Sequence, residues 1–144
     1  MLGLPIRSVV EPRKLVVADP QTSVGEAARM MREGKVGAVL VVEGGRLVGI
    51  FTERDAVYRV MAPGREPDAT PLAEVMTPEP KTVAPDESFG YALLLMHEHG
   101  IRHVPVVEDG RPVGVVSARH ALDPDLEEFT AEAERRKHIR RRAA

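Results

Sequence analysis

Two polar side chains in the stretch "GIFTERD", residues 49–55, stand where an apolar run ends and a helical pattern begins. Thr52 fits the N-cap of that helix, and Asp55 falls at its N3 position. A carboxylate at N3 is favoured by the helix dipole and by unpaired backbone N–H groups, so it should stay ionised. Such a group only accepts hydrogen bonds. Two interpretations stay open: a plain helix cap, or an acceptor for a ligand's hydroxyl groups.

An altered copy of this stretch, "GVVSARH", lies 65 residues further on. At that offset the chain aligns with itself without a gap, and about a third of the aligned positions are identical. An alignment of this kind indicates an internal duplication. The second copy keeps a hydroxyl at Ser117 but has His120 where the first has Asp55.

Each copy predicts the same strands. A short β-branched stretch comes first, at residues 15–18 and again at 81–84, and a proline closes each one. Two longer strands follow, joined by a tight turn at Gly44-Gly45 or Asp109-Gly110, which can supply the positive φ that such hairpins need.

Each copy also predicts two helices. Ser23 is expected to cap the first helix together with Glu26 as a capping box, and Gly34 and Gly100 are expected to end the paired helices. The second helix of each unit should begin at Thr52 or at its counterpart in the second copy. The predicted fold is α+β, with two β-α-β-β-α units packed as a pseudo-twofold pair. Its expected divisions are 1–62 and 73–123 for the repeats, 63–72 for a linker and 124–144 for a charged tail.

This pattern resembles the CBS (cystathionine β-synthase) domain, which occurs in tandem pairs. Residues 49–55 match the family's GhhTxxD element, and "GIRHVPVVEDGRPVGVVSARH" carries the likeness in the second copy. The resemblance covers about residues 7–123. It implies that adenosine compounds bind in clefts between the two units, and that pairs of chains form a flat disc.

The resemblance also implies how the first cleft is built. Asp55 would accept from both ribose hydroxyls, as acids do in dinucleotide-binding folds, and Thr52 would add a bond to ribose or phosphate. The expected ligand-binding residues are Asp55, Thr52, Ile50, Thr82, Val83, Arg102, His103, Val104 and Pro105. Ile50, Val83 and Val104 would hold a purine, while backbone groups near Thr82 read its edge.

Three of these residues have a second interpretation. Arg102 and His103 would place positive charge beside phosphates, or they are an exposed charge and a polar strand-entry residue. Pro105 would touch the ligand or only shape its strand.

A second, degenerate cleft is expected around Ser117, His120, Val17 and Ala38. A neutral imidazole cannot accept from two ribose hydroxyls at once. The opposing wall, residues 17–18 and 37–39, carries no cation. One nucleotide per chain is therefore expected, although His120 could still contact a phosphate.

Composition argues against several classes of protein. The net charge of −2, with two Tyr, three Phe and no Trp, does not suit nucleic-acid binding. The absence of cysteine excludes disulfides and thiol chemistry, and no run approaches the roughly 18 apolar residues of a membrane helix. A soluble cytoplasmic protein is expected.

No catalytic or metal-binding pattern is visible. His97 and His99 point away from each other on one helix, and a Gly100 helix end separates them from His103. Phosphate-cradling glycine loops and the nucleophile elbow are absent. The expectation is no enzyme, no cofactor and no metal.

Two surfaces suggest partners. The stretch 89–100 is apolar nearly all round, with Tyr91, Leu94 and Leu95 where the first copy is more polar, which favours a homodimer. The tail has acids first and bases second, typical of a solvated helix or of a basic contact surface. The predicted function is a non-enzymatic sensor of AMP, ADP, ATP or S-adenosylmethionine that regulates an unidentified protein. The alternatives are a ligand-free dimerisation or docking module and, through the tail, nucleic-acid binding.

Overall fold

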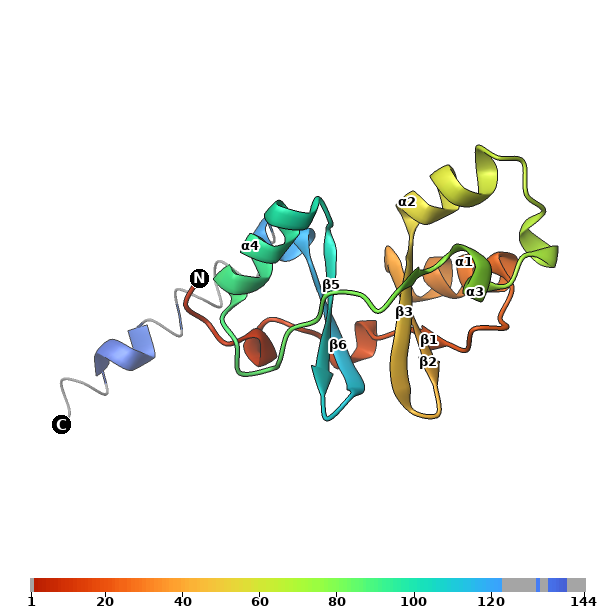
Figure 1. The fold of residues 1–144 in the computed structure, drawn as a ribbon. Coiled ribbons are helices and arrows are strands. Elements are labelled where there is room, and N and C mark those ends of the chain that lie inside the picture. Colours follow the sequence, from red (N-terminus) through yellow and green to blue (C-terminus); the bar gives the residue numbers. More distant parts are fainter. Residues whose placement is uncertain (1, 123–131, 133–134, 140–144) are drawn as a thin grey trace.

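The protein consists of two halves set side by side, each with strands and helices, as a computed structural model shows (Figure 1). The structure describes residues 2–122, 132 and 135–139. In the first half, strands β1 (Val17–Ala18), β2 (Ala38–Glu43), β3 (Arg46–Thr52) and β4 (Thr77–Pro78) form one sheet in that order. In the second half, β5 (His103–Glu108) pairs with β6 (Arg111–Ser117).

The two hairpins match each other in register. Ala38 lies opposite Thr52, and His103 lies opposite Ser117. Both tight turns have the predicted positive φ, 59° and 79° at Gly44 and Gly45 and 53° and 79° at Asp109 and Gly110. The hairpin prediction is confirmed, because both central residues of such a turn must be left-handed.

The leading strands are shorter than predicted. β1 spans two residues of the predicted 15–18, and the predicted strand at 81–84 is reduced to one parallel bridge between Val83 and Val106. A β-branched stretch can favour extended backbone without forming a ladder, because the ladder needs a partner edge along its whole length.

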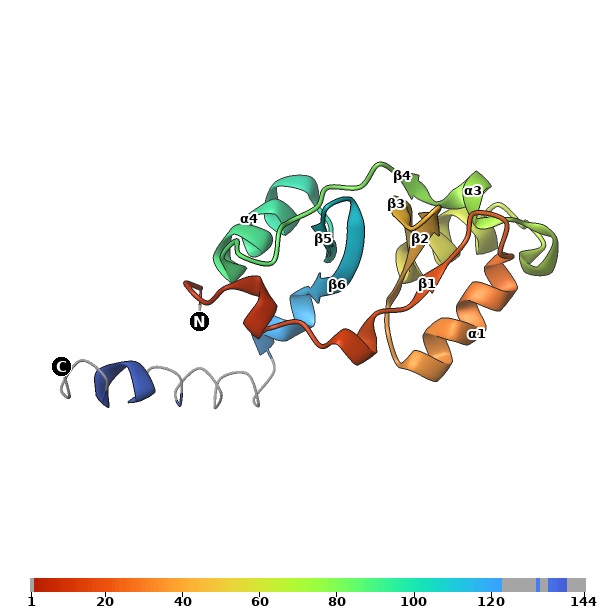
Figure 2. The same cartoon turned by 90° about the horizontal axis from the view of Figure 1, so that it is seen from below.

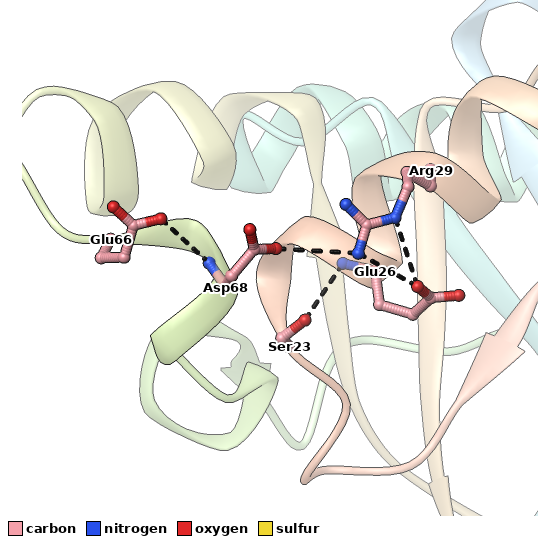
Figure 3. A network of polar contacts seen from close by, with 5 residues as sticks. All are labelled: Ser23, Glu26, Arg29, Glu66 and Asp68. Atoms are coloured by element: carbon pink, nitrogen blue, oxygen red, sulfur yellow. Dashed lines mark hydrogen bonds and ion pairs between the residues drawn. The ribbon is translucent and has the colours of Figure 1, made fainter.

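The main helices start as predicted. α1 (Val24–Gly34) is capped by Ser23, whose Oγ accepts from the Glu26 amide at 3.1 Å, and α4 (Phe89–His99) is capped in the same way by Ser88. The Glu26 carboxylate does not complete the predicted box. It accepts from Arg29, whose Nη2 lies 3.1 Å away (Figure 3).

The two helix ends differ. Gly100 is left-handed with φ 63°, as predicted, but α1 ends with Lys35 as the left-handed residue at φ 54°. α1 therefore stops at Gly34, as predicted, but the left-handed residue is the lysine that follows and not the glycine. Glycine only lowers the cost of this conformation, and the Lys35 amide recovers part of it by donating to the carbonyls of Arg32 and Met31.

We expect Ser23→Ala to lower the free energy of unfolding by about 1 kcal/mol, because the Glu26 amide loses its acceptor. Chemical denaturation monitored by circular dichroism measures this. Ser23→Asp restores an acceptor and should recover most of the loss. Equal stability of Ser23→Ala and the unmodified protein would contradict the expectation.

The helix after Thr52 begins as α2 (Glu53–Asp55) and continues as the π-helical η3 (Ala56–Met61). After Ser117 the chain forms the 3-10 turn η5 (Ala118–Leu122). Both helix starts agree with the prediction. Most of the 124–144 tail lies outside the described residues, although Glu132 and Arg136 form an i,i+4 ion pair at 3.2 Å.

The two halves exchange short segments. Ile6 and Val9 are buried in the core of the second half with Phe89, whereas Leu72 and Val75 of α3 (Leu72–Val75) are buried in the core of the first half. Figures 1 and 2 both show the N-terminal segment running along the second half before it enters the first.

Backbone hydrogen bonds hold the exchanged segments in place. The Ile6 amide donates to the Glu87 carbonyl at 2.8 Å, and the Leu72 amide donates to the Thr22 carbonyl at 2.9 Å. Since Thr22 and Glu87 are equivalent positions, the two exchanges are counterparts of each other.

The connection between the repeats is ordered against α1. It contains the 3-10 turn η4 (Pro67–Ala69), and Asp68 forms an ion pair with Arg29 at 3.6 Å (Figure 3). This contact is exposed, and such pairs contribute little to stability. In the part of the chain that the structure describes, no helix has the length and apolar character to cross a membrane.

The seam between the halves is apolar in its centre. Ala38, Leu40 and Ile50 of the first hairpin are buried there, and Val115 of the second packs against them. The Leu47 amide donates to the Gly110 carbonyl at 3.1 Å, which joins the hairpin tips. The seam therefore holds β3 and β6 face to face, and a cleft opens beside each of their C-terminal ends.

Candidate functional site

The larger opening, here the first cleft, has a volume of about 640 Å³ and walls from both repeats. The first repeat contributes the end of β3 and the start of the helix after it. The second contributes the loops before and after α4. The lining residues are Ile50, Thr52, Glu53, Arg54, Asp55, Arg59, Thr77, Glu79, Pro80, Lys81, His99, Gly100, Ile101, Arg102 and His103.

Asp55 is oriented in this cleft by a complete capping box. Its Oδ2 accepts from the Thr52 amide at 2.9 Å and from the Thr52 hydroxyl at 3.3 Å, while its own amide donates to that hydroxyl at 3.4 Å. Its other oxygen, Oδ1, lies 3.5 Å from Nε of Arg59. The residue is 8% exposed, so the structure fixes this carboxylate at the cleft wall. Both interpretations of Asp55 are compatible, because a carboxylate has acceptor capacity beyond these contacts.

Not every predicted residue lies at the first cleft. Ile50, Thr52, Asp55, Arg102 and His103 line it, whereas Thr82, Val83, Val104 and Pro105 are not among its walls. Val83, Val104 and Pro105 are buried in the second half, and Thr82 is exposed. Because side chains alternate along a strand, His103 faces the cleft and its neighbour Val104 faces the core.

Sequence reasoning missed three basic residues of this cleft, Arg54, Arg59 and Lys81. Arg59 donates to the carbonyls of Val75 and Met76, each at 3.2 Å, besides pairing with Asp55. The i,i+4 spacing of Asp55 and Arg59 on a helix was a usable signal. Arg54 donates to the Gly100 carbonyl at 3.2 Å and so connects the two repeats at the cleft.

Burial works against the positive charge predicted for His103. Burial lowers the pKa of this imidazole below its usual 6.5, and Arg119, His120 and Arg102 lower it further against the opposing effect of Glu53. The neutral ring favours hydrogen bonding over charge attraction. Positive charge in the first cleft therefore comes from the arginines and Lys81.

The second cleft is smaller, about 180 Å³, and is the pseudo-symmetric counterpart of the first. Its lining residues are Glu11, Lys14, Lys35, Val36, Gly37, Ala38, His103, Val115, Ser117, Arg119 and His120. Most of them lie 65 positions from a lining residue of the first cleft. Ser117, His120 and Ala38 are at the predicted place, but Val17 is not among the walls and is 43% exposed.

His120 reproduces the capping geometry of Asp55. Its Nδ1 accepts from the Ser117 amide at 2.9 Å, the same distance that separates the Thr52 amide from Asp55. An imidazole that accepts at Nδ1 and is neutral carries its proton on Nε2. The predicted wall residues, 17–18 and 37–39, carry no cation, but Lys14, Lys35 and Arg119 line the cleft from other positions. Lys14 and Lys35 lie outside the strand and hairpin residues from which the wall was predicted.

No group of three or more His, Asp or Glu side chains is arranged to hold a metal ion among residues 2–122, 132 and 135–139. The walls of both clefts combine hydrogen-bonding and charged side chains with apolar ones. That chemistry fits a polar organic ligand.

Comparison with known proteins identifies the family. The CBS domain family model matches residues 6–62 and 72–125. The CBS domain-containing protein YhcV of Bacillus subtilis (strain 168) is 38% identical over 104 residues, or 72% of this chain and 74% of the relative. Two further curated relatives are longer, and the chain spans 59% and 57% of their lengths.

Solved structures agree. An uncharacterized conserved protein from Pyrococcus horikoshii is 35% identical with a TM-score of 0.78, covering 85% of this chain and 92% of that one. The CBS domain protein PAE2072 from Pyrobaculum aerophilum, solved in complex with AMP, is 25% identical with a TM-score of 0.76, covering 90% of this chain and 99% of that one. The chain therefore belongs to the CBS domain family and carries two of its domains in tandem.

Proposed function

We propose that this CBS pair is a non-enzymatic regulatory module of the cytoplasm that binds an adenosine nucleotide in the first cleft. The observation that carries the proposal is the buried Asp55 carboxylate, fixed by Thr52 at the wall of a cleft that both repeats build. The cleft volume of about 640 Å³ lies within the range of small-molecule sites. A related protein of Pyrobaculum aerophilum binds AMP.

The chemistry of the walls suits the parts of a nucleotide. Oδ1 of Asp55 can accept from ribose hydroxyls, and hydrogen bonds to a charged group contribute about 1.5–3 kcal/mol each. Ile50, Pro80 and Ile101 offer apolar contact for a purine. Arg54, Lys81 and Arg102 can hold phosphate oxygens.

Signalling would follow from the position of the cleft between the repeats. A ligand that touches both repeats binds most tightly to one relative orientation and raises its population. The Arg54–Gly100 contact, which already crosses between the repeats, is one of the bonds that such a shift would alter. The nucleotide would act as a regulatory ligand and not as a cofactor.

The readout surface is proposed to involve a second copy of the chain. Val57, Tyr58 and Met61 on η3 are 47–73% exposed, and Tyr91 and Leu94 on α4 are 41% and 50% exposed. Exposed apolar side chains grouped on helices favour association, and a homodimer would bury them. Such a surface would also suit the regulated protein.

Calorimetric titration with AMP, ADP, ATP and S-adenosylmethionine tests the proposal. We expect saturable binding of at least one compound at one site per chain. Failure of all four to bind would overturn the sensor and favour the alternative, a dimerisation or docking module that uses the exposed apolar side chains. Mass spectrometry of denatured protein, which detects a co-purified nucleotide, provides an independent check.

A further inference from the structure

One side chain, His103, belongs to both clefts. It lines the first and the second, and within the described part of the chain no other residue does so. Its counterpart in the first repeat is Ala38, which lines only the second cleft. The imidazole is therefore an asymmetric element that one repeat places across the seam.

Gly37 makes room for this ring. A Cβ at Gly37 would lie 3.0 Å from Nε2 of His103 and 3.0 Å from Oε1 of Glu53. Both groups thus converge on the bare backbone at the entry to β2, His103 from the second repeat and Glu53 from the first. The counterpart of Gly37 is Arg102, so the second cleft has bare backbone where the first has an arginine, and His103 and Glu53 take up the space that a side chain would need. Because position 37 is a glycine, the imidazole of His103 can reach the second cleft while remaining in the wall of the first.

The groups facing His103 are mainly basic. Arg119 and His120 approach from η5, Arg102 precedes β5, and Glu53 approaches from α2 as the acid. The second cleft adds Lys14 and Lys35, with Glu11 opposing them, and the first adds Asp55 among its arginines. Burial, with Arg119, His120 and Arg102, keeps the pKa of His103 below its usual 6.5 against the opposing effect of Glu53. A bound anion would reverse the balance, because an opposite charge nearby favours the charged imidazolium.

We propose that His103 makes anion binding proton-linked and transmits it between the clefts. When an anionic ligand enters the first cleft, the imidazole takes up a proton from solvent, and the new positive charge then also faces the second cleft. This rests on the proposed function, since it requires that the first cleft bind a nucleotide phosphate. The sign follows from linkage: the bound state holds the higher proton occupancy, so affinity rises as pH falls.

Calorimetry of AMP binding tests the proton uptake. Titration at pH 6.5 in two buffers of different ionisation enthalpy gives the number of protons taken up. We expect the unmodified protein to take up more protons on binding AMP than His103→Gln does. Comparing the two proteins subtracts the protonation of the AMP phosphate itself. Adenosine, which lacks the phosphate, should bind without this excess. The exposed His97→Gln variant is the matched control and should behave like the unmodified protein.

Affinity gives a second measure. AMP should bind the unmodified protein at least about fivefold more tightly at pH 6 than at pH 8, and His103→Gln should lose most of that difference. The Gln side chain keeps a polar amide of similar reach, so a merely structural role of His103 would not remove the pH dependence.

Imidazole NMR titration tests the transmission. On saturation with AMP we expect the titration of His103 to move to higher pH and that of His120, which lines only the second cleft, to move to lower pH. The direct effect of a phosphate on His120 would have the opposite sign. In His103→Gln, the His120 titration should not move to lower pH. This inference alone would be overturned if AMP bound with equal proton uptake to the unmodified protein and to His103→Gln, or if binding left the titration of His103 unchanged. Absence of binding by any adenosine compound would overturn the proposed function and this inference together.

Discussion

Asp55→Ala is expected to weaken nucleotide binding by at least about tenfold, because the ribose loses hydrogen bonds to a charged acceptor that contribute roughly 1.5–3 kcal/mol each. The same change removes the acceptor that the Thr52 amide uses at 2.9 Å, so the protein should also lose about 1 kcal/mol of folding stability. Calorimetry measures the first effect, and chemical denaturation measures the second.

Two variants separate these effects. Asp55→Asn keeps an oxygen that can cap Thr52 but has no charge, so it should retain more stability than Asp55→Ala and still bind poorly. Ser23→Ala removes a similar cap on α1, which contributes no residue to the first cleft, and should bind normally despite a similar loss of stability. Unchanged affinity in a folded Asp55→Ala protein would show that the carboxylate is only a helix cap.

The arginine partner of Asp55 sharpens the interpretation of that experiment. Arg59 lies 3.5 Å from Oδ1 and is held by two backbone carbonyls, so its position does not depend on the carboxylate alone. In Asp55→Ala the guanidinium stays beside the cleft without its acid. Any residual affinity should therefore depend on ligand charge, falling less for ATP than for adenosine.

Sequence reasoning located the parts of the site that depend on local geometry. The Thr52–Asp55 capping box follows from a three-residue spacing at a helix start, and the hairpin turns follow from residues that tolerate positive φ. The duplication then indicated that a second cleft should exist, and Ser117 and His120 lie in it. Each of these inferences required only residues within one helical or hairpin turn, or the internal repeat of the sequence.

The features of the site that the sequence did not predict all depend on tertiary packing. Val83 and Val104 suit an apolar slot and a core equally well, and the second half uses them as core. Lys14 and Lys35 reach the second cleft from a connecting segment and a helix end, which no pattern in the strands could reveal. The pKa of His103 depends on burial and on charges from elements far apart in the chain, so its lowering was not predictable from the residue alone.

The exchanged segments give the largest expected effect on stability. Ile6 and Leu72 are both 0% exposed, and truncating such a side chain typically costs about 2–5 kcal/mol. We expect Ile6→Ala and Leu72→Ala each to lose stability in this range by chemical denaturation. Leu2→Ala, at a position that is 59% exposed, is the control and should change little.

The half of the protein that each substitution perturbs shows whether the segments are exchanged between the halves. Ile6 belongs to the same core cluster as Val104 and Val106, so Ile6→Ala should perturb the methyl resonances of the second half. Leu72 belongs to the same core cluster as Val39 and Val41, so Leu72→Ala should perturb the methyl resonances of the first half. If Ile6→Ala instead perturbed Val39 and Val41 most, the reciprocal exchange would be wrong.

The exchange also bears on signalling. The core of each half is completed by a short segment that belongs to the other repeat in the sequence. The two repeats therefore cannot separate without exposing buried apolar surface. A ligand in the first cleft can therefore change their relative orientation only within the limits that these segments allow. For the proposed signalling we therefore expect a small rotation about the apolar seam and not an opening of the pair, with the changing contacts at the cleft walls, where Arg54 and Gly100 meet.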